Sequence, residues 1–399
     1  IVLFAVMAAA PAARKELVFG NKYLGLSILL VLAASAVSAA LSADSAAGFE
    51  QTSKLFCYAL IYFICLNLFK TTREYSILAY VLIAAGLLIS FLGIYQHFWG
   101  LSDSYRQLLA EPGTYNAVVF NEMKQNIASG RSFSTFIYPN ALAGYLTVIL
   151  PLPLLAFNYV KTKTMKTGLI IAFLLMLYAL FLTASLGGWL TLSALIFAFI
   201  AGTAYYGTGY QKKIAIGFVL LAAVLALVLA VTAEQSGIYR ALSASRSIAD
   251  RIEYWRTGLK MFGDNIFNGT GPGTFGQNYR QYSASASVYG LYPHNHYIQV
   301  MAEQGILGIA AWLFFLVSLG AVIFNRIKKA ITIPGSIVIA ASAPLAAFLL
   351  HNFMDIDSNF WENTLLWWGL LGAFIGLTQA APPASGEAAR RDSLPGRLL

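Results

Sequence analysis

One polar stretch interrupts a chain that otherwise consists of long apolar runs: EQSGIYRALSASRSIADRIEYWRTGLKMFGDNIFNGTGPGTFGQNYRQYSASASVYGLYPHNHY, residues 234–297. It gathers several arginines, a glycine-rich turn and two histidines. Ionisable side chains are costly inside a bilayer, so a place where they collect in a membrane protein is the default candidate for chemistry. The apolar runs on either side therefore determine the fold, and the polar stretch is the first candidate for function.

The composition indicates a membrane protein. The 399 residues are 58% hydrophobic and 11% charged, with a mean hydropathy of +0.68, whereas a soluble domain carries about 25% charged residues. The net charge of +9 does not by itself indicate nucleic-acid binding, because Lys and Arg collect in the short cytoplasmic loops of membrane proteins. Cys57 and Cys65 fall in one predicted helix about 12 Å apart, too far for a disulfide, and we interpret them as packing residues.

Runs long enough to cross a bilayer, about 20 residues each, predict an all-α polytopic membrane helix bundle. They occur at residues 23–42, 53–69, 75–98, 139–159, 167–186, 187–206, 212–233, 296–325, 334–353 and 361–380. A further run at 1–10 is half a span, which indicates that the chain lacks its natural start. Eleven spans are thus visible in the sequence, and we expect twelve, with both termini on one side.

The positions of Lys and Arg predict the topology. Their short clusters all fall on one side of the bundle, at residues 14–22, 70–73, 161–166, 212–213, 326–329 and 390–391. Basic residues of short loops face the cytoplasm, so the first long loop (99–138) and the second (234–295) are predicted to face away from it. We predict one membrane domain over residues 1–380, which includes both loops, and a disordered cytoplasmic tail over 381–399.

The second loop begins with a predicted amphipathic helix. Ser247 and Asp250 form a candidate capping box at its start. Apolar residues then repeat at helical spacing, namely Ile248, Ile252, Trp255, Leu259 and Phe262. Arg251 lies at the edge of this apolar stripe. The middle of the first loop is also expected to form an amphipathic helix, lying at the membrane interface.

The arginines of these loops are candidate ligands for an anionic group. A planar guanidinium binds phosphate through paired hydrogen bonds and keeps its charge. Arg251 and Arg246 are favoured, because the predicted helix can hold them against the membrane. The alternative is that these arginines are ordinary solvated residues or contact phospholipid headgroups.

His294 and His296 begin a predicted span beside the polar loop. An imidazole can accept a proton near neutral pH, so His294 is the candidate general base and His296 the residue that orients it. A metal site is one alternative and needs further ligands, which only His351, Asp355 and Asp357 supply on that side. Purely structural hydrogen bonding is the other.

Three further patterns have ordinary structural interpretations. The turn Gly269-Thr270-Gly271-Pro272-Gly273 lacks the preceding strand and the following Gly-Lys-Ser/Thr of a phosphate-binding loop, so we predict a tight turn that glycine permits. Asp355 and Asp357 are expected to cap a helix rather than to hold Mg²⁺. The segment Ser185-Leu186-Gly187-Gly188-Trp189 is predicted to join two closely packed spans.

In their order along the chain, these residues resemble the O-antigen ligase and polymerase superfamily of bacterial envelope glycosyltransferases. The similarity covers roughly residues 130–360, and the ordered set of motifs is more specific than any one of them. The motifs are Arg131-Ser-Phe-Ser-Thr-Phe136, Pro139-Asn-Ala-Leu-Ala143, Arg251-Ile-Glu-Tyr-Trp255, Gly269-x-Gly271-x-Gly273-x-Phe275, His294-Asn295-His296-Tyr297 and Glu303-Gln-Gly-Ile-Leu-Gly308.

The resemblance implies a GT-C-like, inverting, metal-independent glycosyltransferase that needs no cofactor and works at the periplasmic face of the bacterial inner membrane. Its donor would be a glycan on undecaprenyl diphosphate. Its acceptor would be lipid A-core for a ligase, or a second lipid-linked glycan for a polymerase. Carried over, His294 is the base and Arg251, with Arg246, holds the diphosphate. The supporting residues are His296, Asn295, Tyr297, Trp255 and Glu303.

The chain departs from the family pattern at one position. Many relatives carry arginine after the serine of Ser185-x-Gly187, where this chain has Leu186. Arg131 and Arg246 are then the candidates for the second diphosphate-binding arginine, and polymerase remains the alternative to ligase. A transporter of lipid-linked glycans would predict charged or broken helices near the bilayer midplane, whereas these spans contain almost no ionisable residues. A non-catalytic scaffold would leave the histidines and arginines replaceable.

Overall fold

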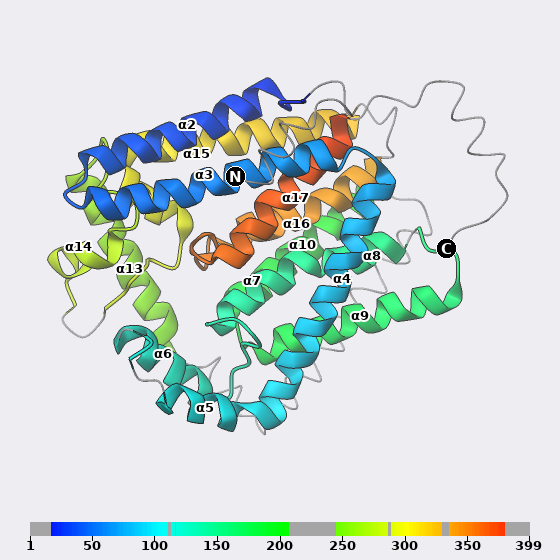
Figure 1. Cartoon of the computed structure of the whole chain (residues 1–399), viewed down its shortest axis with the longest axis horizontal. Helices are drawn as coiled ribbons and strands as arrows, with labels where there is room; N and C mark the ends of the chain where they lie inside the picture. The colour runs from blue at the N-terminus through cyan, green and yellow to red at the C-terminus, as the bar shows by residue number, and fades with distance from the viewer. Residues whose placement is uncertain are drawn as a thin grey trace.

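The computed structural model describes residues 17–110, 113–115, 117–157, 159–206, 245–285, 289–328 and 335–379 (Figure 1). Every regular element within these ranges is helical, which confirms the prediction of an all-α membrane bundle. The α-helices are α2 (Lys22–Leu41), α3 (Ser45–Leu68), α4 (Thr72–Tyr95), α5 (Leu101–Ala110), α6 (Ala117–Ala128), α7 (Pro139–Ile149), α8 (Pro151–Phe157), α9 (Lys163–Leu182), α10 (Leu186–Tyr206), α13 (Ser245–Asp264), α14 (Phe275–Tyr282), α15 (His296–Lys328), α16 (Gly335–His351) and α17 (Trp361–Gln379). A π-helical turn, η1 (Gln96–Gly100), and a 3-10 turn, η2 (Asp357–Asn359), join some of them.

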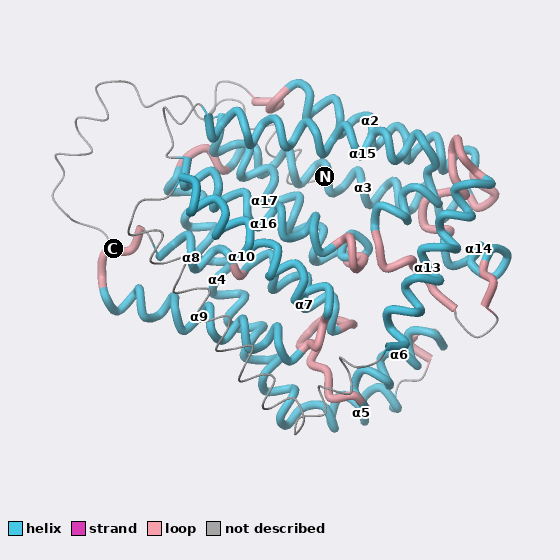
Figure 2. The backbone as a smooth tube through the Cα atoms, turned by 180° about the vertical axis from the view of Figure 1, so that it is seen from behind, coloured by secondary structure: helices cyan, strands magenta, loops and turns pink. Residues whose placement is uncertain are grey.

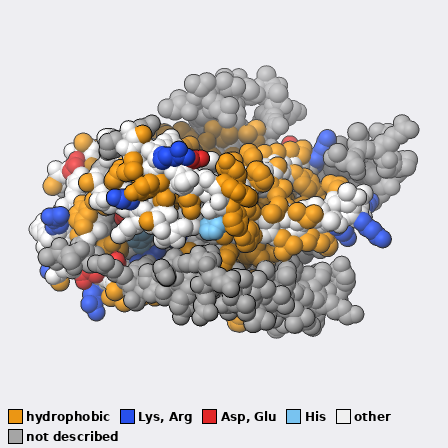
Figure 3. All heavy atoms as spheres, turned by 90° about the horizontal axis from the view of Figure 1, so that it is seen from below, with side chains coloured by type: hydrophobic (Ala, Val, Ile, Leu, Met, Phe, Trp, Pro, Cys, Tyr) orange, Lys and Arg blue, Asp and Glu red, His pale blue; other side chains and the backbone are white. Residues whose placement is uncertain are grey.

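Six described helical segments are long and apolar enough to cross a membrane. They are Lys22–Leu41, Ser45–Leu68, Thr72–Ala110, Pro139–Phe157, Lys163–Leu182 and His296–Lys328. Figure 3 shows hydrophobic side chains across the middle of the described surface, with charged side chains toward its two ends. The predicted spans at 1–10 and 212–233 and the tail at 381–399 lie outside the described residues, so the predicted number of spans stays a prediction.

Two spans end differently from the prediction. The run expected to end at residue 98 continues through η1 into α5 and reaches Ala110. Gln96 in this turn accepts a hydrogen bond of 2.9 Å from the backbone N–H of Phe133, which ties the segment to the end of the first loop. The run predicted at 139–159 divides at Leu150 into α7 and α8, because Pro151 cannot donate the hydrogen bond that would continue the helix.

The first described helices pack against the last ones. Figures 1 and 2 show α2 alongside α15 and α3 alongside α17. The apolar core between them includes Leu24, Ile28, Tyr62, Phe315 and Trp367. A second core joins α4 and α9 with α7 and α8, and it includes Ile83, Leu142, Leu146, Leu152 and Met176. These two cores fix the ends of the helices that carry the polar loops.

A buried carboxylate fixes the glycine turn. Gly269, Gly271 and Gly273 all have positive φ values, of 67°, 113° and 77°, which confirms the predicted turn. Glu303 of α15 accepts hydrogen bonds from the backbone N–H of Gly273 at 2.9 Å and of Phe275 at 3.0 Å. The turn therefore binds a carboxylate of the protein itself, and Glu303 is placed as a structural residue.

The hairpin formed by α2 and α3 holds the glycine turn from the other side. Ser38 of α2 donates to the backbone oxygens of Asn268 at 2.6 Å and of Glu303 at 2.8 Å. Ser42 donates to the backbone oxygen of Thr270 at 2.9 Å. The start of α15 is thus held between the hairpin and the second loop.

A kink divides α15 just after this point. Gly305 has non-helical backbone angles (φ 63°, ψ −154°), and the backbone N–H of Ile306 donates instead to the oxygen of Ile266 at 2.7 Å. The first two turns of α15 are thereby docked on the second loop, while the longer second part runs through the bundle.

We expect Gly305→Ala to lower the melting temperature of the purified protein. Alanine would have to adopt φ +63°, and its Cβ would lie 2.5 Å from the backbone oxygen of Phe267, a strain of about 1–3 kcal/mol. Gly320→Ala in the same helix is the matched control, because its Cβ meets nothing within 4 Å and alanine favours the helix. Equal melting temperatures for the two variants would contradict a requirement for glycine at position 305.

Both loops contain helices. A helix in the middle of the first loop is confirmed as α6, and the helix at the start of the second loop is confirmed as α13. The capping box predicted at Ser247 and Asp250 is wrong, because Ser245 and the residues after it are already helical. Both residues therefore lie inside α13 rather than at its N-terminus. The segment Ser185–Trp189 follows α9 and opens α10, as predicted.

Candidate active site

His294 lies at the corner between the second loop and α15. Its backbone φ of +49° is in the left-handed region. A residue other than glycine adopts this conformation where the surrounding structure holds it there. The next residue, Asn295, caps α15: its Oδ1 accepts from the backbone N–H of Tyr297 at 3.0 Å and of Ile298 at 3.1 Å. Its Nδ2 donates to the backbone oxygen of Phe353 at 2.9 Å. Asn295 thus supports the site by fixing the corner that carries His294.

A buried carboxylate holds the imidazole. Nδ1 of His294 lies 3.1 Å from Oδ1 of Asp355, whose side chain is 1% exposed. The other carboxylate oxygen, Oδ2, lies 3.6 Å from Nη2 of Arg251. Arg251 belongs to α13 and Asp355 follows α16, so three segments distant in the sequence meet at one carboxylate.

The charge of Asp355 sets the chemistry of His294. Burial by itself raises the pKa of Asp355, but electrostatic interactions with His294 and Arg251 and the hydrogen bond from His294 hold that pKa below its ordinary value. An ionised carboxylate accepts a hydrogen bond from Nδ1–H, which leaves a lone pair on Nε2 of the neutral ring. With 30% of the His294 side chain exposed, Nε2 is the nitrogen that can take a proton from a substrate.

The ring of Tyr254 covers one face of His294. The two rings stack at a centroid distance of 5.7 Å and an interplanar angle of 27°. Tyr254 lies three residues after Arg251, so one face of α13 supplies both the guanidinium and the stacking ring. Trp255, predicted to support the site, has a buried indole N–H with no hydrogen-bond partner among the described residues, and its neighbour Tyr254 makes the contact.

Arg131 is the second arginine near the carboxylate. Its Nε donates to the backbone oxygen of Thr183 at 2.8 Å, and its two terminal nitrogens donate to Asn126 at 3.0 Å and to Asn140 at 2.7 Å. Burial lowers the pKa of Arg131 to about 10, and Asp355 and Arg251 act on it electrostatically. Arg131 therefore joins the predicted site and is tied to the segment before Leu186. The side chain of Arg246, in α13, lies outside the described residues, so its role stays a prediction.

His296 does not orient His294 as expected. Its Nδ1 lies 2.7 Å from Oγ of Ser358, and its ring meets that of Trp312 edge to face at 4.9 Å. Asp355 takes the expected role because the chain after α16 folds back onto the corner at His294. Tyr297 donates from its hydroxyl to the backbone oxygen of Leu349 at 2.9 Å, so it ties α15 to α16.

The prediction that Asp355 and Asp357 cap a helix is also wrong. Each carboxylate pairs with a histidine instead, since Asp357 Oδ2 lies 2.6 Å from Nδ1 of His351 and both side chains are fully buried. Within the described ranges, no group of three or more His, Cys, Asp or Glu side chains is arranged to hold a metal ion. The two aspartates therefore fix two imidazoles at the end of the bundle.

Sequence reasoning missed one acidic residue of the site. Glu122 of α6 interacts electrostatically with His294, Asp355 and Tyr138. No motif marks Glu122, because it is one carboxylate in a loop helix of mixed composition. In the sequence, Asp355 was a candidate helix cap and a candidate metal ligand, and its position gave no sign of a contact with His294.

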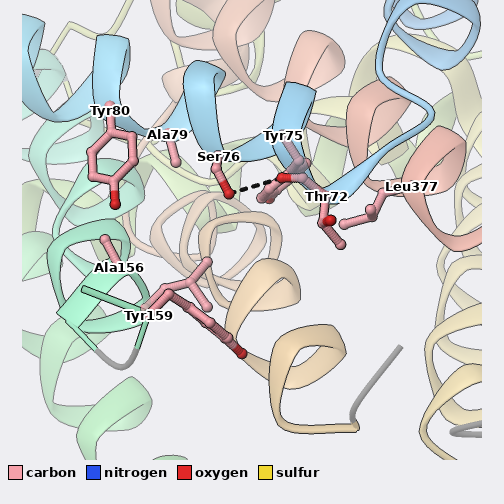
Figure 4. A pocket seen from close by; sticks show the side chains of 9 residues that line it. Thr72, Tyr75, Ser76, Ala79, Tyr80, Ala156, Tyr159 and Leu377 are labelled. Atoms are coloured by element: carbon pink, nitrogen blue, oxygen red, sulfur yellow. Dashed lines mark hydrogen bonds between the residues drawn. The ribbon is translucent and has the colours of Figure 1, made fainter. Parts of the chain in front are cut away.

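A small pocket lies elsewhere in the bundle and is not part of this site. Its volume is about 70 Å³. It is lined by Thr72, Tyr75, Ser76, Ala79, Tyr80, Leu155, Ala156, Tyr159 and Leu377 (Figure 4). These residues belong to the start of α4, the ends of α8 and α17, and the turn after α8. Those are the ends of the spans away from the first loop and His294.

Residues 171–313 match the family model described as O-antigen ligase. This segment is similar to the O-antigen ligase family. The resemblance inferred from the motifs is thereby confirmed. A search of curated proteins found no match.

The O-antigen ligase segment covers only part of the candidate active site. It contains Arg251, Tyr254 and His294, whereas Arg131 precedes it and Asp355 follows it. The spatial arrangement therefore links residues from both sides of the O-antigen ligase segment to the histidine within it.

Proposed function

We propose that this protein is a membrane glycosyltransferase that moves a glycan from undecaprenyl diphosphate to a sugar hydroxyl of lipid A-core. The O-antigen ligase family supports a glycosyltransferase of the ligase or polymerase type in general. The observation that carries the finer proposal is the His294–Asp355–Arg251 arrangement, with distances of 3.1 and 3.6 Å around one buried carboxylate. It supports the proposal, because an imidazole and a guanidinium lie beside the same carboxylate.

The proposed step is a single displacement. The acceptor hydroxyl gives its proton to Nε2 of His294 while its oxygen forms a bond to the anomeric carbon of the donor sugar. The bond between that carbon and the diphosphate oxygen breaks, and the diphosphate leaves with the electron pair. Attack opposite the leaving group inverts the anomeric configuration. Asp355 stabilises the imidazolium that forms, as an ionised carboxylate close to it does.

The charge on the leaving diphosphate requires a positive partner. We assign this role to Arg251, because a guanidinium makes paired, charge-assisted bonds to phosphate oxygens. Arg131 lies near the same carboxylate and adds positive charge to the same end of the bundle. We propose that these two residues, with Arg246 as the further candidate on α13, take the place of a metal ion. Transfer is then expected to continue in EDTA, and its loss would contradict this part of the proposal.

The cellular setting follows from the same chemistry. A pre-activated lipid diphosphate supplies the sugar without ATP or a nucleotide sugar, which suits a site on the periplasmic side of the bacterial inner membrane. The distribution of Lys and Arg along the sequence supports that orientation.

Deleting the gene tests the proposed function. The expected result is lipopolysaccharide with a bare core on a gel, with the glycan polymer retained on its lipid carrier. A core that carries one repeat unit would show the polymerase of the same family type instead. Unchanged lipopolysaccharide would contradict both activities.

A further inference from the structure

The chain between α16 and α17 forms a short loop that presents Asp355 to His294. Helix α16 ends at His351, the 3-10 turn η2 covers Asp357–Asn359, and α17 begins at Trp361. The backbone N–H of Asp355 donates to the backbone oxygen of His351 at 2.9 Å, so the loop leaves α16 in a tight turn. The carboxylate of Asp355 then lies 3.1 Å from Nδ1 of His294. Its position depends on what fixes this loop.

A histidine and an aspartate close the loop. Nδ1 of His351 lies 2.6 Å from Oδ2 of Asp357, and both side chains are 0% exposed. Asp355 lies between these two residues in the sequence, so the bond joins the chain on both sides of it. A hydrogen bond in such a buried place is stronger than one in water. The pair therefore limits the conformations that are open to Asp355.

The neighbouring helices leave room for this pair at two glycines. Helices α7, α10 and α17 pack against α16 (Figures 1 and 2). A Cβ at Gly144 of α7 would collide with the carboxylate of Asp357. A Cβ at Gly187 of α10 would lie 3.2 Å from Nε2 of His351. From α17, Nδ2 of Asn363 donates to Oδ1 of Asp357 at 3.2 Å. The pair is thus enclosed by these helices.

The His351–Asp357 pair is a costly way to fill the space between these helices. Burying two ionisable side chains costs desolvation energy, and apolar side chains of similar volume often pack with equal or greater stability. A hydrogen bond adds what an apolar contact lacks, namely a narrow range of distance and direction between two atoms. A fixed geometry is therefore the property that distinguishes this pair from an apolar core.

The same loop is also bonded to the first turn of α15, the helix that follows His294. Oγ of Ser358 lies 2.7 Å from Nδ1 of His296. Nδ2 of Asn359 donates to Oε1 of Gln299 at 2.9 Å. These bonds hold the end of the loop to the helix whose start carries the proposed base. The loop is thus fixed to both α16 and α15.

We propose that the His351–Asp357 pair is a positioning element of the reaction, which holds the carboxylate of Asp355 at His294. Neither member of the pair reaches a substrate, because both side chains are fully buried. They act through Asp355, which stabilises the imidazolium that forms at His294. This inference rests on the proposed function, since it presupposes that His294 takes a proton from an acceptor hydroxyl.

Steady-state transfer by purified protein in lipid nanodiscs tests this role. The donor is the undecaprenyl-diphosphate-linked glycan, and the acceptor is lipopolysaccharide core purified from the deletion strain. His351→Leu removes the bond to Asp357 and is expected to lower kcat about 10–10²-fold, the scale of loss when a remote change misplaces a catalytic group. The KM values for donor and core should stay at those of the wild type, because the pair contacts neither substrate.

His351→Asn tests the hydrogen bond itself. The side-chain amide of asparagine carries a donor close to the position of Nδ1 and can bond to Asp357. This variant should therefore recover most of the kcat that His351→Leu loses. Equal kcat values for the two variants would contradict a role for this bond.

A double-mutant cycle separates positioning from a general structural role. Asp355→Asn alone is expected to lower kcat. Adding His351→Leu to it should lower kcat no further, because the pair acts through a carboxylate that is already absent. Losses that multiply in the double variant would show independent effects and would overturn the proposal.

Tyr75→Phe is the control for the loss of a buried hydrogen bond. The hydroxyl of Tyr75 donates to the backbone oxygen of Ala341 at 3.3 Å, in the small pocket away from the active site. Its variant should keep the wild-type kcat, with or without Asp355→Asn in the same chain, relative to that background. A fall in kcat equal to that of His351→Leu would indicate a general effect of lost stability.

A variant of the other partner keeps the test open if His351→Leu does not yield folded protein. Asp357→Asn then replaces it and should give a smaller loss of kcat, because the amide oxygen still accepts a hydrogen bond. That loss should also disappear in the Asp355→Asn background, and its persistence there would overturn the positioning role.

The positioning role and the proposed function fail differently. Folded His351→Leu protein with the wild-type kcat would overturn the positioning role. Wild-type protein that neither binds lipid-linked glycan nor transfers it would remove both proposals. Transfer that depends on His294 and Asp355 but not on His351 would remove the positioning role alone.

Discussion

His294→Ala is expected to reduce glycan transfer by about 10²–10⁴-fold, the usual contribution of a positioned general base. The ring is held by Asp355 at 3.1 Å and by stacking on Tyr254, so the substitution removes a positioned Nε2. Binding of the lipid-linked donor should persist, because Arg251 and Arg131 remain in place. Transfer is measured by the gel mobility of the glycosylated lipid A-core. Donor binding is measured by the shift in melting temperature that the donor causes.

His97→Ala is the control for removing an imidazole. His97 lies in η1, and its Nδ1 is 2.9 Å from the backbone oxygen of Gly130, outside the set of residues around Asp355. Its variant should keep most of the wild-type transfer rate. Full transfer activity in His294→Ala would contradict the assignment of the base, and loss of donor binding there would indicate a structural role.

Arg251→Gln is expected to lower kcat/KM for the donor by about 10²–10³-fold, the usual loss when one stabilising group is taken from a developing charge. The guanidinium faces Asp355 across 3.6 Å and is 10% exposed, so it is a desolvated charge near the reacting centre. Its loss also removes one of the influences that lower the pKa of Asp355. Arg251→Lys keeps the charge but not the planar fork, and we expect an intermediate value.

Arg256→Gln is the matched control for this substitution. Arg256 lies in the same helix, five residues further along, and is exposed. The same change there removes one positive charge from α13 without touching Asp355, so kcat/KM should stay close to the wild-type value. Equal losses in the two variants would indicate a general effect of charge on lipid attraction rather than a diphosphate ligand at position 251.

The sequence predicts the helices better than it predicts their partners. Long apolar runs identify spans because a bilayer imposes both length and composition. Turns inside such runs are harder to predict. The π-helical turn at Gln96–Gly100 continues one helical segment across a change in polarity that predicts the end of the span. The kink at Gly305 depends on the approach of the backbone at Phe267, which lies far from it in sequence.

The sequence predicts individual residues of the candidate site but not the contacts between them. His294 and Arg251 stand out because each is an ionisable residue in a motif beside a span. The pairing of His294 with Asp355 joins residues 61 positions apart, and sequence spacing carries no information on such a contact. The expected orienting role of His296 failed because residues two positions apart at a helix start point in different directions. Glu122 stayed invisible, since nothing local distinguishes it from a solvated glutamate.

The pairing of the first helices with the last has a consequence for biosynthesis. The ribosome makes about 5–20 residues per second from the N-terminus, so α2 and α3 enter the membrane well before α15 and α17 exist. During that interval the faces of the hairpin that carry Ile28 and Tyr62 lack their native partners. Insertion of α17 closes this core, and Asp355 emerges shortly before it. The nascent chain therefore acquires its active site only after Asp355 has been synthesised.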